Sequence, residues 1–157
     1  MFSQIAAIAL SLAAFAPAPA QDWYYVDSDT GHANISFIDK ASIRTNAGGN
    51  AEAAMFSVLA ADEDGAAAFR FVIEVQCAAG KSRLMTGETF DSALKSSGAD
   101  AMDSEWESVD PGTQGESIQK FVCSKGASMP ESKSLGSALP LAKGRAMLAE
   151  MAGKASK

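Results

Sequence analysis

The 157-residue sequence predicts an α+β domain, in which an antiparallel meander of short strands carries one helix on one face. Three observations predict this fold. Short apolar or alternating runs, each bounded by turn residues, recur from Asp22 to Val109. A run with apolar residues at helical spacing follows within 111–123. The chain also contains two cysteines, Cys77 at the end of a predicted strand and Cys123 at the end of the predicted helix.

The first two strands are predicted to pair as a hairpin. Residues 22–26 are aromatic and β-branched and end at DSDTG, whose Asp, Ser and Gly favour a turn. In residues 33–38, Ile35 and Phe37 alternate with polar side chains, as is typical of a strand. The segments DKASI and NAGGN then predict a bend and a glycine-rich turn.

A second hairpin is predicted from residues 51–60 and 66–77, which flank the turn sequence ADEDG. One face of its second strand collects the apolar residues Phe69, Phe71, Ile73 and Val75. Cys77 is in phase with this face, so we expect it to point inward at the end of a central strand.

Residues 81–90 predict a fifth strand, and residues 105–109 predict a short last strand before a Pro-Gly turn. Between them, residues 91–106 are polar and small. They predict a loop with room for one helical turn.

The predicted helix places Ile118, Phe121 and Val122 on one side, against the sheet. We expect Cys77 and Cys123 to form a disulfide that tethers this helix, closing a loop of about 46 residues worth roughly 4 kcal/mol. The alternatives are two unrelated buried thiols, or one thiol reserved for an intermolecular bond.

Residues 1–20 predict a secretory signal peptide, because an uncharged apolar core is followed by the small-residue sequence APAPA. The alternative is an uncleaved anchor, although the apolar core is shorter than the roughly 20 residues that span a bilayer. We therefore expect export to the periplasm or the extracellular space. No cysteine follows the predicted cleavage site, so we expect no lipid anchor.

Residues 22–123 are expected to form the domain, and residues 124–157 a Ser-, Lys- and Gly-rich linker with a possible short C-terminal helix. Leu141, Met147, Leu148 and Met151 would share one side of that helix. It would either bind a partner or a membrane surface, or form a frayed end that docks weakly on its own domain.

The charge pattern and the residue inventory exclude several functions. The acidic excess lies in residues 1–123, which argues against nucleic-acid binding. One histidine and two cysteines expected in a disulfide provide neither a catalytic triad nor a usual zinc site, and no phosphate-binding loop is present. We expect no metal and no cofactor.

Asp103, Glu105 and Glu107 alternate around Trp106, so a strand would place the three carboxylates on one face. Paired carboxylates can perform glycoside hydrolysis when burial keeps one of them protonated. Beside a Ser-rich loop, a solvated acidic face is the alternative interpretation.

A contact surface is predicted at the first hairpin. The three aromatic residues of WYY cannot all face one side of a strand, because side chains alternate. With Trp23 and Tyr25 inward, Tyr24 would be exposed beside the turn. The predicted binding residues are Tyr24, Asp27, Asp29 and His32.

Several of these motifs, in this order, resemble the surface-adhesin protein E family of bacteria. They are Trp23, the element FIDKASI at 37–43, the strand ending in Cys77, Trp106 ahead of Pro111 and Gly112, and IQKFVC ending in Cys123. The resemblance implies a six-stranded antiparallel sheet with a helix tethered to its concave side by the disulfide. It also implies surface display and attachment to host extracellular-matrix proteins.

The expected function is therefore that of an exported, non-catalytic module that binds a protein partner in the envelope or the extracellular matrix. A small periplasmic hydrolase or enzyme accessory domain using the acidic cluster is one alternative. An envelope structural or inhibitory protein is another. We expect no membrane span after cleavage of the signal peptide. The sequence leaves open whether the chain forms a homodimer.

Overall fold

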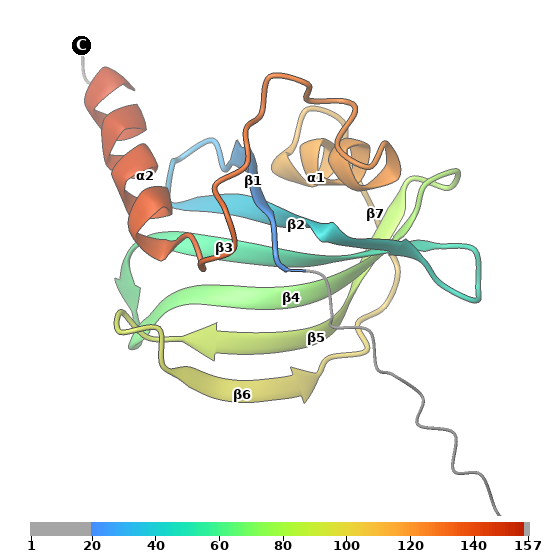
Figure 1. Cartoon of the computed structure of the whole chain (residues 1–157), viewed down its shortest axis with the longest axis horizontal. Helices are drawn as coiled ribbons and strands as arrows, with labels where there is room; N and C mark the ends of the chain where they lie inside the picture. Colours follow the sequence, from blue (N-terminus) through green and yellow to red (C-terminus); the bar gives the residue numbers. More distant parts are fainter. Residues whose placement is uncertain (1–19, 156–157) are drawn as a thin grey trace, which may run out of the picture.

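The computed structural model describes residues 20–155, which form one antiparallel sheet with two helices (Figure 1). The predicted signal peptide lies almost wholly outside the described residues. The elements are β1 (Trp23–Ser28), β2 (Asn34–Thr45), β3 (Ala51–Glu63), β4 (Ala66–Gln76), β5 (Lys81–Phe90), β6 (Ser96–Ala101), β7 (Glu107–Ser108), α1 (Gln114–Cys123) and α2 (Leu141–Ala155). Strands β1 to β6 follow one another in sheet order, and β7 pairs with β5. The predicted α+β meander is confirmed.

The β3–β4 hairpin shows how local sequence sets the topology. Glu63 pairs with Ala66 across a two-residue turn. The two turn residues, Asp64 and Gly65, have φ of 50° and 82°. Such a turn needs positive φ at both positions, which explains the Asp-Gly sequence.

The predicted bend at DKASI is a bulge inside the long strand β2, where the register with β3 shifts between Asp39 and Arg44. Ser42 bridges the irregularity, because its hydroxyl donates to the carbonyl of Asp39 and accepts from the amide of Ala54. The strand therefore continues through the bend.

The sixth strand lies elsewhere than predicted. Residues 96–101, expected in a loop, form β6 and pair with β5, whereas only Glu107–Ser108 of the predicted last strand is extended and paired. Every residue of β6 is exposed. Its composition of Ser, Gly, Ala and Asp has low β propensity, so the edge strand carries no local signal of its own.

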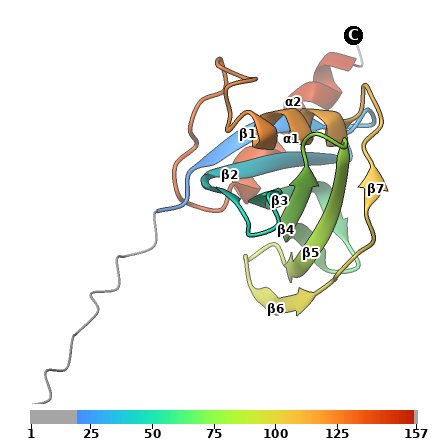
Figure 2. The same ribbon diagram turned by 90° about the vertical axis from the view of Figure 1, so that its right-hand side faces the viewer.

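Both faces of the sheet are apolar, and a helix covers part of each. Alternation along β3 sends Phe56 and Val58 to one face and Ala53 and Met55 to the other. The first face packs against α2, and the second packs against α1 (Figures 1 and 2). On the α1 side the buried residues are Val26, Ile38, Ala53, Ile73, Val75, Phe121 and Val122.

The C-terminal region packs more closely than a linker with a weakly docked end. Residues 132–136 line the free edge of β1, where the amide of Leu135 donates to the carbonyl of Trp23 at 2.8 Å. The amide of Trp23 in turn donates to the carbonyl of Gly136 at 3.1 Å. Helix α2 then buries Leu141 and Leu148 against the sheet, so this segment is part of the folded body.

Candidate functional site

A groove on the described surface lies between α1 and strands β4 and β5. We call it the α1 groove. Its volume is about 250 Å³, and one wall is the segment that contains Ser104 and Glu107. It is lined by Met55, Ile73, Val75, Ser82, Arg83, Leu84, Ser104, Glu107, Gly115, Ile118 and Gln119. Most of the exposed lining is apolar, as in binding sites for amphipathic ligands.

The N-terminal end of α1 is fixed to the first hairpin. Thr113 caps the helix by accepting a hydrogen bond from the amide of Glu116. The hydroxyl of Ser117 donates to Asp27 Oδ2 at 2.6 Å, and the side-chain amide of Gln114 donates to the carbonyl of Asp27 at 3.1 Å. These contacts hold the helix at a defined height above the sheet.

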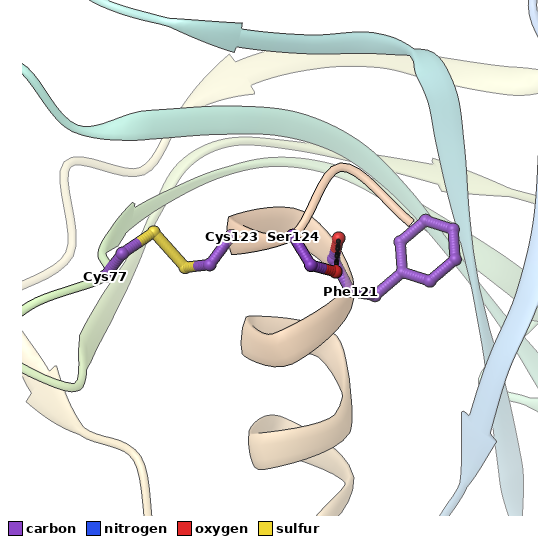
Figure 3. Close-up of a disulfide and its surroundings, with 4 residues drawn as sticks. All are labelled: Cys77, Phe121, Cys123 and Ser124. Carbon is purple, nitrogen blue, oxygen red and sulfur yellow. Dashed lines mark hydrogen bonds between the residues drawn. A yellow bond between two sulfur atoms is a disulfide. The ribbon is translucent and has the colours of Figure 1, made fainter. Parts of the chain in front are cut away.

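The C-terminal end of α1 is fixed by the predicted disulfide, which joins Cys77 to Cys123 (Figure 3). Phe121 and Val122, just before Cys123, are buried as predicted. The expected inward position of Cys77 is wrong, however. Strand β4 ends at Gln76, and Cys77 lies exposed in the following turn. The disulfide therefore ties the exposed β4–β5 turn to the partly buried end of the helix.

The wall opposite α1 is tied to β5 by main-chain and side-chain hydrogen bonds. The amide of Leu84 donates to Ser104 Oγ at 2.8 Å, and the amide of Ser104 donates back to the carbonyl of Leu84 at 3.0 Å. The Arg83 guanidinium stands 4.6 Å from the centre of the Trp106 ring, a cation–π arrangement. The groove thus has two braced walls.

Arg83 is itself held by a buried carboxylate, that of Glu74. Glu74 accepts hydrogen bonds from Asn46 at 2.6 Å, from Asn50 at 2.8 Å and from Arg83 Nε at 2.8 Å. Burial by itself raises the pKa of Glu74, but the hydrogen bonds from Asn50, Asn46 and Arg83 outweigh it, so the pKa lies below its usual value. No local sequence pattern predicts this network, because Glu74 is separated in the chain from Asn46, Asn50 and Arg83.

An apolar strip continues beyond the groove along the same face. Phe69 and Phe71 stack with ring centres 6.0 Å apart. Gly87 pairs with Phe71 across β4 and β5, and Met102 fills the space over it, since a Cβ on Gly87 would come within 2.6 Å of the Met102 sulfur. Met102 is 45% exposed, so the strip is open to solvent.

The three residues of the predicted acidic cluster do not share one strand: Glu107 lies on β7, whereas Asp103 and Glu105 lie in the segment before it. Asp103 has φ of 40°, so alternation breaks there. Asp103, Glu105 and Glu107 are all exposed, and Glu107 lines the groove. Within residues 20–155, no Lys or Arg forms an ion pair with any of these three carboxylates. Nor does this part of the chain hold a group of three or more His, Cys, Asp or Glu placed to bind a metal ion.

The predicted exposure of Tyr24 is wrong. Its side chain is half-buried, and its ring lies 5.9 Å from the ring of Phe121 under α1. Trp23 is fully buried on the opposite face, as the alternation predicts. The expectation failed because both faces of this sheet are covered, so the side away from Trp23 is also core.

The acidic residues of the same hairpin make local contacts. Besides its contact with Ser117, Asp27 accepts from the amide of Ser28. Asp29 accepts from the amide of Asn34 at 2.8 Å, which closes the turn. His32 adopts φ of 53°, and its Nδ1 lies 3.2 Å from Ser28 Oγ. Asp27, Asp29 and His32 thus make contacts within the turn, whereas Tyr24 packs under α1.

Comparison with known proteins identifies the family. A sequence model of the family described as surface-adhesin protein E matches residues 23–124, the stretch from the first residue of β1 to the residue after Cys123. No curated protein and no solved structure matches the chain. Neither helix among residues 20–155 has the length and apolar character needed to cross a membrane. With the meander, the covering helix and its disulfide in place over the matched residues, the chain belongs to the surface-adhesin protein E family.

Proposed function

We propose that this protein is an exported, non-catalytic module that captures a protein partner in the cell envelope or the extracellular matrix. The observation that carries the proposal is the family match, which covers the sheet, α1 and the disulfide together. A family of surface adhesins implies an exported or surface protein that acts by binding.

The residue types that line the groove favour a binding function over catalysis. Its lining contains hydroxyl, amide, guanidinium and carboxylate groups, but no histidine and no free thiol that could activate a nucleophile. Its apolar floor and polar margin are the usual composition of a recognition site. The composition of residues 1–20 supports export by a cleaved signal peptide.

The proposal is tested with the chain from Gln21 immobilised through a C-terminal tag. Purified extracellular-matrix proteins and envelope fractions are passed over it, and binding is measured by surface plasmon resonance. We expect saturable binding of a protein partner at physiological salt. Absence of any saturable partner in both sets would contradict the proposal.

Turnover assays on ester, peptide and glycoside substrates test the hydrolase alternative. Specific turnover that is lost in Glu105→Gln would replace the binding function with a catalytic one. The first hairpin is a second candidate contact surface, with Asp27, Asp29 and His32 as its residues, whereas Tyr24 packs under α1. Loss of capture in Asp29→Asn at unchanged melting temperature would favour it.

A further inference from the structure

We propose that the α1 groove binds a short peptide segment of the partner in which an apolar side chain is flanked by Lys or Arg. This inference rests on the proposed binding function and names the site and the chemistry of its ligand. The floor of the groove, its size and the charge of its rim each support one part of it.

The floor selects an apolar side chain. Met55, Ile73 and Leu84 face the groove from three neighbouring strands, and Ile118 faces it from α1. The open strip of Phe71 and Met102 extends this surface toward β6. An extended peptide could therefore place one side chain in the groove and lie along the strip.

The size of the groove fits side chains better than a cofactor. Pockets for drug-sized ligands and cofactors measure about 300–1,000 Å³. The groove, at about 250 Å³, lies below that range and is open on one side. A protruding side chain of a protein partner fills such a hollow, as the anchor residues of protein interfaces do.

The rim selects positive charge. Ser104, Glu107 and Gly115 line the groove, and the segment 100–116 to which they belong contains acidic residues but no Lys, Arg or His. The one cation in the lining, Arg83, is paired with Glu74. Its carboxylates are Asp100, Asp103, Glu105, Glu107, Asp110 and Glu116. Only Glu116 forms an ion pair within the described part of the chain, with Lys120. Unpaired carboxylates beside an apolar hollow attract a ligand that combines cations with an apolar centre.

The test uses a labelled peptide, acetyl-KKLFLKK-amide, and fluorescence anisotropy with the full mature chain. Two matched peptides separate the contributions: EELFLEE reverses the charge, and KKSGSKK removes the apolar centre. We expect KKLFLKK to bind at least tenfold more tightly than either, with an affinity that weakens as salt is raised. Equal binding of KKSGSKK would contradict the apolar part of the proposal, and equal binding of EELFLEE would contradict the charge part.

Two protein variants locate the site. Glu105→Lys with Glu107→Lys reverses the rim, and we expect at least a tenfold loss of KKLFLKK affinity. The matched control is Glu63→Lys with Glu131→Lys, which changes the net charge equally at exposed carboxylates away from the groove. We expect that control to bind within twofold of the unmodified protein. An equal loss in both variants would show attraction to net charge and overturn the site.

A third variant, Ser82→Trp, fills the groove from β5 without removing a buried group. We expect it to block KKLFLKK at an unchanged melting temperature, whereas undiminished binding would overturn the site.

The variants also separate this inference from the proposed function. If the rim and groove variants capture the natural partner as well as the unmodified protein does, the assignment of the α1 groove as the binding site is wrong, but the proposed binding function is unaffected. If the unmodified protein captures no partner, the binding function itself fails.

Discussion

Glu74 holds together the buried polar network of the sheet through its carboxylate. It is buried, and it receives hydrogen bonds from Asn46, Asn50 and Arg83. We expect Glu74→Gln to lower the free energy of unfolding by about 2 kcal/mol, because hydrogen bonds to a charged group are lost. Urea unfolding at neutral pH measures this change. Glu150→Gln is the control: it breaks only the exposed pair with Lys154 on α2 and should leave the urea unfolding curve nearly unchanged.

The same carboxylate predicts a dependence of stability on pH. The pKa of Glu74 in the folded protein lies below its usual value, whereas an unfolded Glu titrates near 4.3. The ionised form is thus favoured in the fold, and its contribution is complete above about pH 4.3 and is lost as the pH falls through the folded pKa. Unfolding curves at neutral pH and at pH 3 should therefore show a smaller gap between the unmodified protein and Glu74→Gln in acid. A gap that widens in acid would contradict the assignment.

Tyr24 is expected to act as a core residue. Because its ring packs on Phe121 under α1, Tyr24→Ala should lower the free energy of unfolding by about 2 kcal/mol, somewhat less than truncation of a fully buried aromatic. Tyr24→Phe keeps the ring and should leave the melting temperature nearly unchanged. Thermal unfolding of both variants distinguishes this outcome from that of an exposed contact residue, for which neither change would matter.

At the scale of elements, α2 approaches the sheet closely enough to require a glycine. A Cβ on Gly144 would lie 3.0 Å from both Phe37 and Val58, which are fully buried. We expect Gly144→Ala to destabilise the protein although alanine favours helix, because neither neighbour can yield in a packed core. Gly153 has open space around it, so Gly153→Ala should be neutral or stabilising by up to about 1 kcal/mol. Melting temperatures that rise in both variants would show that α2 does not pack on the sheet.

The disulfide fixes the C-terminal end of the other helix, α1. Reduction, or Cys77→Ser with Cys123→Ser, should lower the free energy of unfolding by about 4 kcal/mol, from a sequence separation of 46 residues in the chain-entropy model. Thermal unfolding with and without reductant measures the change. Thiol counting on denatured protein should find no free cysteine before reduction, and two free thiols in fresh protein would contradict the pairing.

The elements that could be predicted from sequence are those with a local signal. The Asp-Gly turn at 64–65 and the spacing of Phe121 and Val122 identify a hairpin and a helix without tertiary information. Strand β6 could not be predicted, because its pairing with β5 alone makes it a strand. The α1 groove was also missed, since its walls come from segments distant in the chain.

At the scale of the whole molecule, the sheet has two apolar faces, so a separate element must cover and bury each face. The family match ends at residue 124, yet α2 beyond it buries Leu141 and Leu148 on the face that contains Phe56. From the sequence we expected α1 as one cover, and the C-terminal helix either as a partner- or membrane-binding helix or as an end that docks weakly on its own domain, because residue spacing alone does not show how closely a helix packs. The run WYYV at the start of β1 was the available sign, since consecutive apolar residues in a strand indicate burial on both sides.

A chain that ends at residue 140 tests this arrangement. It keeps the segment along β1 but lacks α2, and it should expose the face around Phe37 and Val58. We expect it to bind the dye ANS and to form oligomers by light scattering, as large exposed apolar patches do. A monomeric truncated chain with the melting temperature of the full protein would show that α2 is dispensable.

The position of the disulfide also determines how the molecule would bear tension. Because the bond joins residues 77 and 123, a pull on the two ends of the chain runs from β4 directly into the end of α1. The enclosed loop contains β5, β6, β7 and most of α1, and with them most of the groove lining. About 160 Å of extended chain is thereby withheld from stretching. Under tension the bond would therefore keep the groove walls from β5 and α1 together in one covalently closed ring, whereas the floor residues Met55 and Ile73 lie on strands outside that ring.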